Sequence, residues 1–227
     1  MGADLRLVIF DVDGTLVDSQ GDILGAMTRA FEGVALTVPS RKEILGIVGL
    51  SLDVAMERLV PDAPKTTRDD MVEGYKNAYI AMRAEVGAAQ SSPLYPGALE
   101  VLAHLNAIPD VLLGIATGKS RRGLDKLLEA HDLGHLFVTQ QVADHHPSKP
   151  HPSMVLQAMS DVGVASKDTV MVGDTSFDMQ MAASAGVHGI GVSWGYHPMS
   201  ALTDAAHILD DFAALPETLD NVWGTKA

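Results

Sequence analysis

Short apolar runs, separated by helical patterns, are the feature that most restricts how this chain can fold. The candidate strands are Leu5–Phe10, Val111–Ala116, Thr169–Val172 and Val187–Val192, with weaker candidates at Leu136–Val138 and Ala206–Leu209. Apolar strands that alternate with helices form parallel sheets with both faces covered. We therefore predict an α/β fold built on a parallel sheet.

The segment from about Asp18 to Pro93 differs, because it carries helix signals and no convincing strand. Ser40 and Glu43 have the spacing of a capping box, and Thr67–Val86 has the pattern of a long helix. The turn-rich segment Ser91–Gly97 then leads back to the sheet. We predict a core domain made of residues 1–17 and 94–227, interrupted by an all-helical domain of residues 18–93.

Composition excludes several classes of protein. The 227 residues carry a formal charge of −13 and no cysteine. A nucleic-acid binder needs a basic surface, and a disulfide or thiolate metal site needs cysteine. No apolar run approaches the length of a membrane span. We expect a cytoplasmic protein, monomer or homodimer, that binds neither nucleic acid nor membrane; a small anionic substrate remains compatible with a bound metal ion.

Polar residues follow three of the predicted strands. They are Asp11–Thr15, Thr117–Lys119 and Gly173–Asp178, and the polar segment Ser148–Pro152 stands before a predicted helix. Ligands of open parallel sheets bind outside the carboxyl ends of the strands. We therefore expect these segments to converge on one site.

The residue types in this site suit phosphoryl transfer. Asp11 and Asp174 can provide the carboxylate oxygens that Mg²⁺ prefers. Gly14 permits a turn that brings Asp13 back to the site as a general acid and base. The Thr117 hydroxyl, the Gly118 amide and the Lys149 ammonium can hold the phosphoryl oxygens, and those three residues complete the predicted set.

Together these motifs resemble the haloacid dehalogenase superfamily of phosphohydrolases, and within it the phosphoglycolate phosphatase group. The resemblance rests on Asp11–Ser19, Thr117, Lys149 and Gly173–Asp178, supported by Tyr95–Ala98 and Gly186. It implies a Rossmann-like core with a helical C1-type cap, a Mg²⁺ cofactor and a small phosphorylated metabolite as substrate, phosphoglycolate being the best single guess.

The resemblance also implies roles for individual residues. Asp11 is expected to be the nucleophile that forms an aspartyl-phosphate and to bind the metal. Asp13 is expected to be the acid and base, with its main-chain carbonyl on the metal, and Asp174 a further metal ligand. Asp178 is expected to orient metal-bound water or Lys149. In the cap, the turn around Gly49, Leu50 and Ser51 is expected to reach toward the substrate.

Other conspicuous side chains have plainer interpretations. His145, His146 and His151 are expected to be exposed loop histidines, since no cysteine or acidic partner completes a zinc site. Arg121 and Arg122 can contact phosphate or lie on a helix surface. Met71, Tyr75, Tyr79 and Met82 can line a pocket, but their spacing is more typical of helix packing.

Two rival functions use the same motifs. A sugar phosphomutase of the same superfamily needs Asp11 and Asp13 in the same roles, and differs in excluding water while the aspartate is phosphorylated. A non-enzymatic regulator could accept phosphate on Asp11, but it would leave Asp13 and the helical domain without a purpose.

Overall fold

The computed structural model describes residues 5–224, so the ends of the predicted core domain, 1–4 and 225–227, lie outside the described residues. Its centre is a six-stranded parallel sheet in the order β3-β2-β1-β4-β5-β6. The strands are β1 (Arg6–Phe10), β2 (Val111–Thr117), β3 (Phe137–Val142), β4 (Thr169–Gly173), β5 (His188–Val192) and β6 (His207–Leu209). The α/β prediction is confirmed.

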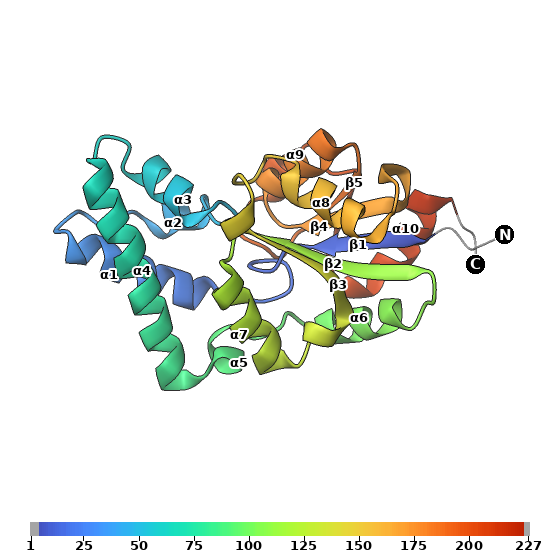
Figure 1. Ribbon diagram of the computed structural model, residues 1–227, viewed down its shortest axis with the longest axis horizontal. Coiled ribbons are helices and arrows are strands. Elements are labelled where there is room, and N and C mark those ends of the chain that lie inside the picture. The colour runs from blue at the N-terminus through green and yellow to red at the C-terminus, as the bar shows by residue number, and fades with distance from the viewer. Residues whose placement is uncertain (1–4, 225–227) are drawn as a thin grey trace.

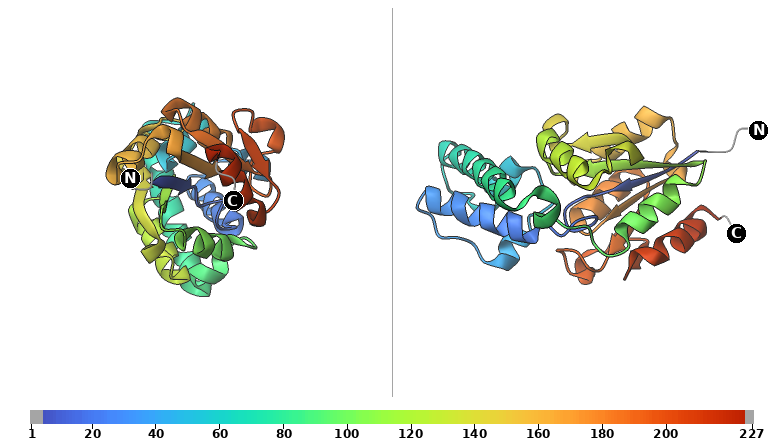
Figure 2. Two further views of the ribbon diagram at one scale, coloured as in Figure 1. Left: turned by 90° about the vertical axis from the view of Figure 1, so that its right-hand side faces the viewer. Right: turned by 90° about the horizontal axis from the view of Figure 1, so that it is seen from below.

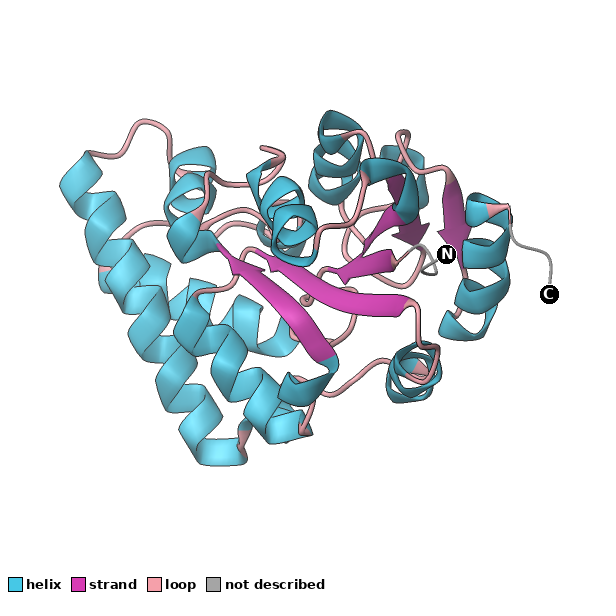
Figure 3. Ribbon diagram, turned by 45° about the vertical axis from the view of Figure 1, so that its right-hand side comes forward, coloured by secondary structure: helices cyan, strands magenta, loops and turns pink. Residues whose placement is uncertain are grey.

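Both faces of the sheet are covered, as its apolar strands require. Along β1 the side chains alternate: Val8 and Phe10 pack into one buried cluster, and Leu7 and Ile9 into another. The first cluster includes residues of α6 (Ala98–Asn106), α7 (Arg121–His131) and α10 (Leu215–Trp223); the second includes residues of α8 (Ser153–Val162) and α9 (Ser176–Ala185). Figure 3 shows helices on both sides of the strands.

Between β1 and α6 the chain leaves the sheet and forms five helices. They are α1 (Gln20–Gly33), α2 (Arg41–Leu45), α3 (Leu52–Leu59), α4 (Lys65–Val86) and α5 (Ala88–Ser91). Figures 1 and 2 show α1–α4 beside one end of the sheet. A third buried cluster, which includes Met27, Phe31, Met56 and Met71, lies among these helices. Apart from Phe177 of α9, the buried residues of this cluster belong to the helical segment, which therefore has an apolar core that is largely its own.

The local signals of this segment behave as expected, with small differences in the helix limits. Ser40 and Glu43 form both hydrogen bonds of a capping box at the start of α2. Helix α4 begins at Lys65, two residues before the predicted start, because Pro64 ends the preceding loop and can stand at the cap of a helix that it could not continue. No helix within residues 5–224 is long and apolar enough to cross a membrane.

The topology creates one place where loops from distant parts of the sequence meet. Strand β1 lies between β2 and β4, and the order of the sheet reverses there. The loops after these three strands therefore leave side by side at the carboxyl edge, facing the helical segment (Figure 1).

Candidate active site

Three buried carboxylates lie together at this edge of the sheet. Asp11 follows β1, Asp174 follows β4, and Asp178 lies in the first turn of α9. One oxygen from each lies within 4.8 Å of the others. The Asp174 carboxylate is fixed by Thr15, whose hydroxyl donates to Oδ1 at 3.0 Å, and by the backbone amide of Tyr196, which donates to Oδ2 at 2.8 Å.

The charges of this cluster are only partly compensated. Burial raises the pKa of Asp11 to about 7, although the neighbouring Lys149 acts to lower it. Burial, and then the charges of Asp11 and Asp178, raise the pKa of Asp174. The Asp11 Oδ2 atom is buried and has no hydrogen-bond partner. An all-carboxylate donor set with an orphaned oxygen fits a hard cation, so this cluster can hold a metal ion.

Lys149 is the buried cation of the site. Its side chain is 0 % exposed, and Nζ donates to Asp11 Oδ1 and to Asp178 Oδ1, each at 2.7 Å. Asp178 is itself oriented, because its Oδ2 atom accepts hydrogen bonds from the amide and hydroxyl of Thr175. The structure therefore places Asp178 in contact with Lys149 and also within the carboxylate cluster, where the sequence predicted that it would orient either metal-bound water or Lys149.

Asp13 belongs to a different part of the site. Gly14, with φ at +87°, turns the chain sharply after it; a side chain on Gly14 would overlap Asp174. The Asp13 Oδ1 atom accepts from the Ser19 hydroxyl and pairs with Lys119 Nζ at 2.7 Å. Among the described residues nothing bonds Oδ2, and Asp13 lines a cavity of about 820 Å³, so this oxygen is open to a ligand.

Thr117 and Gly118 form the turn after β2. Thr117 is fully buried, and its hydroxyl accepts from the Lys119 amide at 3.2 Å. A Cβ atom on Gly118 would lie 2.6 Å from the Gly49 carbonyl oxygen and 2.8 Å from that of Leu50. The absence of a side chain on Gly118 therefore lets the helical segment approach the sheet at this turn.

A cavity of about 820 Å³ lies between the sheet edge and the helical segment. Asp11 and Asp13 line it from one side. The predicted turn Gly49–Ser51 lines it from the other, and the Ser51 amide donates to the Ser148 hydroxyl at 2.8 Å. Of the predicted core residues, Asp11, Asp13 and Gly118 thus meet the predicted cap turn around one space, whereas Thr117, Lys149 and Asp174 do not line it.

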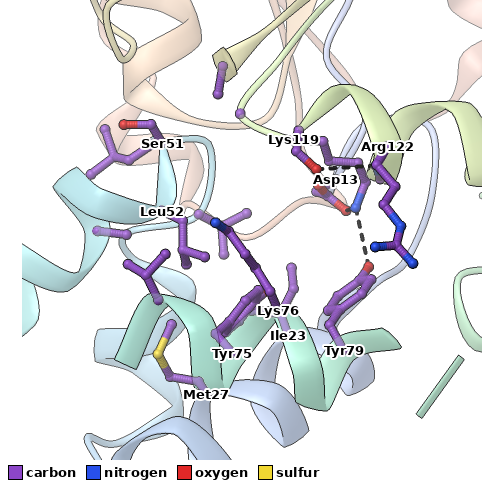
Figure 4. A pocket seen from close by; sticks show the side chains of 18 of the residues that line it. Asp13, Ile23, Met27, Ser51, Leu52, Tyr75, Lys76, Tyr79, Lys119 and Arg122 are labelled. Atoms are coloured by element: carbon purple, nitrogen blue, oxygen red, sulfur yellow. Dashed lines mark hydrogen bonds and ion pairs between the residues drawn. The ribbon is translucent and has the colours of Figure 1, made fainter. Parts of the chain in front are cut away.

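Tyr75 and Tyr79 of α4 also line this cavity, as Figure 4 shows. Both interpretations of the sequence hold for these two residues, which line the cavity and also pack against the apolar cluster of the helical segment. Their rings stack 5.8 Å apart, and Arg83 and Lys119 lie against the Tyr79 ring. Met71 does pack inside the helical segment, as its spacing indicated. The pattern identified one helix face but not that part of this face borders a cavity.

The histidines near Lys149 differ in how far they are exposed. His145 and His151 are exposed, as expected. His146 is instead half-buried and bonded to Gln141 and Ser153 through its two ring nitrogens, because the loop folds back over β3. Burial also lowers the pKa of His146.

The two arginines after Lys119 differ in their positions. Arg121 binds the side chain and carbonyl of Gln140 on the helix surface. Arg122 lines the cavity and is labelled in Figure 4.

Sequence reasoning did not assign a role to Lys119, Ser19 or Tyr196. The Tyr196 hydroxyl accepts from the Ser19 amide at 2.9 Å, so it braces the residue that holds Asp13. Lys119 had one available signal: it directly follows the predicted Thr117–Gly118 turn. Ser19 and Tyr196 are 177 positions apart, and only the folded chain brings them together.

Known proteins resemble this chain over most of its length. Residues 8–192 match the model of the haloacid dehalogenase-like hydrolase family. A protein named probable phosphatase IndB from Dickeya dadantii is 37 % identical, over 91 % of this chain and 90 % of that protein. The phosphoglycolate phosphatase of Escherichia coli K12 is 31 % identical, over 86 % of this chain and 83 % of that enzyme.

A solved structure has the same architecture. It is the crystal structure of a predicted phosphoglycolate phosphatase from Haemophilus somnus, with a TM-score of 0.79 and 28 % identity, and the match covers 96 % of this chain and 99 % of that one. The sequence match, the shared fold and the buried carboxylates at the sheet edge agree: the chain is an enzyme that belongs to the haloacid dehalogenase-like hydrolase family.

Proposed function

We propose that this chain, a phosphatase of the haloacid dehalogenase family, hydrolyses a small phosphomonoester with Mg²⁺ through an aspartyl-phosphate on Asp11. One observation carries the proposal. A buried carboxylate with an unbonded oxygen lies beside a buried lysine, and an acid whose Oδ2 is open lines the same cavity. These are the nucleophile, the charge that screens it, and the proton donor that phosphoryl transfer needs.

The first step uses Asp11 and Asp13. An oxygen of Asp11 forms a bond to phosphorus while the bond from phosphorus to the alcohol oxygen breaks. Asp13 donates its proton to that leaving oxygen, so the alcohol departs neutral. In the second step Asp13 takes a proton from water, whose oxygen bonds to phosphorus. Phosphate then leaves and the Asp11 carboxylate is restored.

The phosphoryl group is held by residues from two loops. We assign the Thr117 hydroxyl and the Gly118 amide to its oxygens from the turn after β2. Lys149 adds a fixed positive charge, and its contact with Asp178 keeps the ammonium in place in a site where water does not screen charge. Because these donors are already oriented, they need no rearrangement as charge develops.

The carboxylate cluster is proposed as the magnesium site. Asp11 and Asp174 would hold the ion through carboxylate oxygens and Asp13 through its main-chain carbonyl. When bound, Mg²⁺ would reduce the repulsion between the Asp11 carboxylate and the substrate phosphate. The orphaned Oδ2 of Asp11 supports this assignment.

We propose that residues 18–93 form a cap domain on a core of residues 1–17 and 94–227. The largely separate apolar core of the helical segment and its side of the cavity support this division. In this position the cap would exclude bulk water during transfer, and its Gly49–Ser51 turn would contact the alcohol part of the substrate. Phosphoglycolate is the first substrate to assay, because named relatives act on it.

A phosphate-release assay tests this function. We expect multiple turnovers of phosphate from a small phosphomonoester with Mg²⁺, and release at background level in EDTA, restored when Mg²⁺ is added back. Turnover without any added sugar bisphosphate would distinguish hydrolysis from mutase chemistry. Undiminished release in EDTA would contradict the metal assignment.

A further inference from the structure

Lys119 is a buried ammonium with an incomplete set of partners. It lies in the loop between β2 and α7, and its side chain is 8 % exposed. Nζ pairs with Asp13 Oδ1 at 2.7 Å and donates to the Tyr79 hydroxyl at 3.2 Å. A lysine ammonium has three N–H donors. Within residues 5–224 only these two oxygens bond it, so one N–H is open.

The open donor belongs to a group that borders the cavity. Figure 4 shows Lys119 between Asp13 and Tyr79 at the cavity wall, and both neighbours are cavity-lining residues. The other lysines of the wall are less suited to bind a ligand deep in the site. Lys76 and Lys126 are at least half exposed and paired with acidic residues of their own helices.

The position of Lys119 next to Asp13 suits it to contact the alcohol part of the substrate. In the proposed mechanism Asp13 contacts the ester oxygen of the leaving alcohol. Lys119 pairs with the other oxygen of that same carboxylate. In this mechanism its ammonium would therefore lie beside the first carbon atoms of the alcohol. A substrate oxygen on the carbon next to the ester carbon would meet the open N–H.

We propose that Lys119 is a specificity-determining residue that binds a carboxylate group attached directly to the ester carbon, so that the preferred substrates are 2-phosphooxy carboxylates. A carboxylate is favoured over a hydroxyl, because charge-assisted hydrogen bonds are shorter and about twice as strong as neutral ones. The proposal rests on the proposed phosphatase function and adds a residue that recognises the alcohol part of the substrate.

The test combines a variant of Lys119 with a change in the alcohol part of the substrate. Wild-type protein and Lys119→Met are compared on phosphoglycolate, on 2-hydroxyethyl phosphate and on ethyl phosphate, which lacks the oxygen group. We expect Lys119→Met to reduce kcat/KM for phosphoglycolate about 100-fold more than for ethyl phosphate. The matched control Lys76→Met, which changes an exposed cavity lysine, is expected to affect all three substrates equally.

Three other results would overturn the proposal. An equal loss on phosphoglycolate and ethyl phosphate would mean that Lys119 only positions Asp13. If Lys119→Met lost kcat/KM selectively on 2-hydroxyethyl phosphate, the Lys119 ammonium would bind a hydroxyl and not a carboxylate. If the wild-type enzyme showed no preference for phosphoglycolate over ethyl phosphate, the proposed specificity would be wrong without any variant. If Lys119→Met does not fold, Lys119→Arg replaces it and is expected to retain part of the preference. Turnover of ethyl phosphate that Asp11→Asn abolishes would uphold the proposed function in every case.

Discussion

Lys149 shows what a single residue contributes to this site. Its ammonium is enclosed between Asp11 and Asp178, which are themselves removed from water. Each partner compensates the cost of burying the others, and the gain is lost when one is removed. The lysine that would hold the phosphoryl group is thus also part of what holds the sheet edge together.

Replacing this lysine should therefore destabilise the protein. Lys149→Met leaves two buried carboxylates without their cation, and we expect a loss of about 3–5 kcal/mol in the free energy of unfolding. Urea denaturation in metal-free buffer measures it. The control Lys65→Met changes a lysine that is 79 % exposed and should leave stability nearly unchanged. Equal stability of the two variants would contradict this account of Lys149.

Single residues also mark how far the sequence could predict the site. Asp11, Asp13, Thr117 and Asp174 were predictable, because each follows a recognisable strand and topology brings the strand ends together. The partnership between Lys119 and Tyr79 was not, because it joins a core loop to a helix 40 positions away. The local sequence pattern indicates which side of a helix is buried, but not which distant residue forms a hydrogen bond with that side.

At the scale of elements, apolar runs predicted the central strands better than the edge. Strands β1, β2, β4 and β5 fall where continuous apolar sequence lies. Strand β3 extends to Val142, beyond the predicted run at Leu136–Val138, because Thr139 and Gln141 are buried polar residues that bond one another. Their hydrogen bonds to each other and to Asp161 offset the cost of burial, and no hydrophobic pattern signals that.

His197 forms hydrogen bonds to α9 of the core and to the residue that follows α2 of the helical segment. His197 Nδ1 accepts from the Ser176 amide at 3.2 Å, and Nε2 therefore carries the proton and donates to the Gly46 carbonyl at 3.2 Å. Burial lowers the pKa of His197, opposed by the Gly46 carbonyl and by Asp178, while Arg58 lowers it further. Protonation would remove the acceptor that Ser176 uses.

This histidine predicts a pH dependence of stability. Because its pKa is lower in the folded chain than the ordinary 6.5, the unfolded chain binds the proton more tightly, and stability is lost as pH falls through and below 6.5. The Tm of the wild-type protein should thus fall more between pH 7.5 and pH 5.5 than the Tm of His197→Asn, because the asparagine stays neutral and keeps a hydrogen-bond acceptor. The remaining histidines are common to both proteins. Equal decreases in Tm would refute the prediction.

At the scale of the whole molecule, the division of labour follows from topology. The sheet gathers polar residues from three strand ends, and the helical segment lies over them and encloses the cavity. Chemistry can then stay constant while the covering helices adapt to different alcohols. The sequence therefore predicts the reaction more readily than the substrate, which depends on side chains that meet only in the folded cavity.

The central claim is that phosphate passes through Asp11, and trapping the intermediate tests it most directly. Enzyme mixed with radiolabelled substrate and Mg²⁺ is quenched in acid, reduced with borohydride and digested. An aspartyl-phosphate is reduced to homoserine, so the account predicts homoserine at position 11, in proportion to the bound label, and neither label nor homoserine in Asp11→Asn. Label bound at another residue, or an Asp11→Asn enzyme that releases phosphate at the wild-type rate, would contradict it.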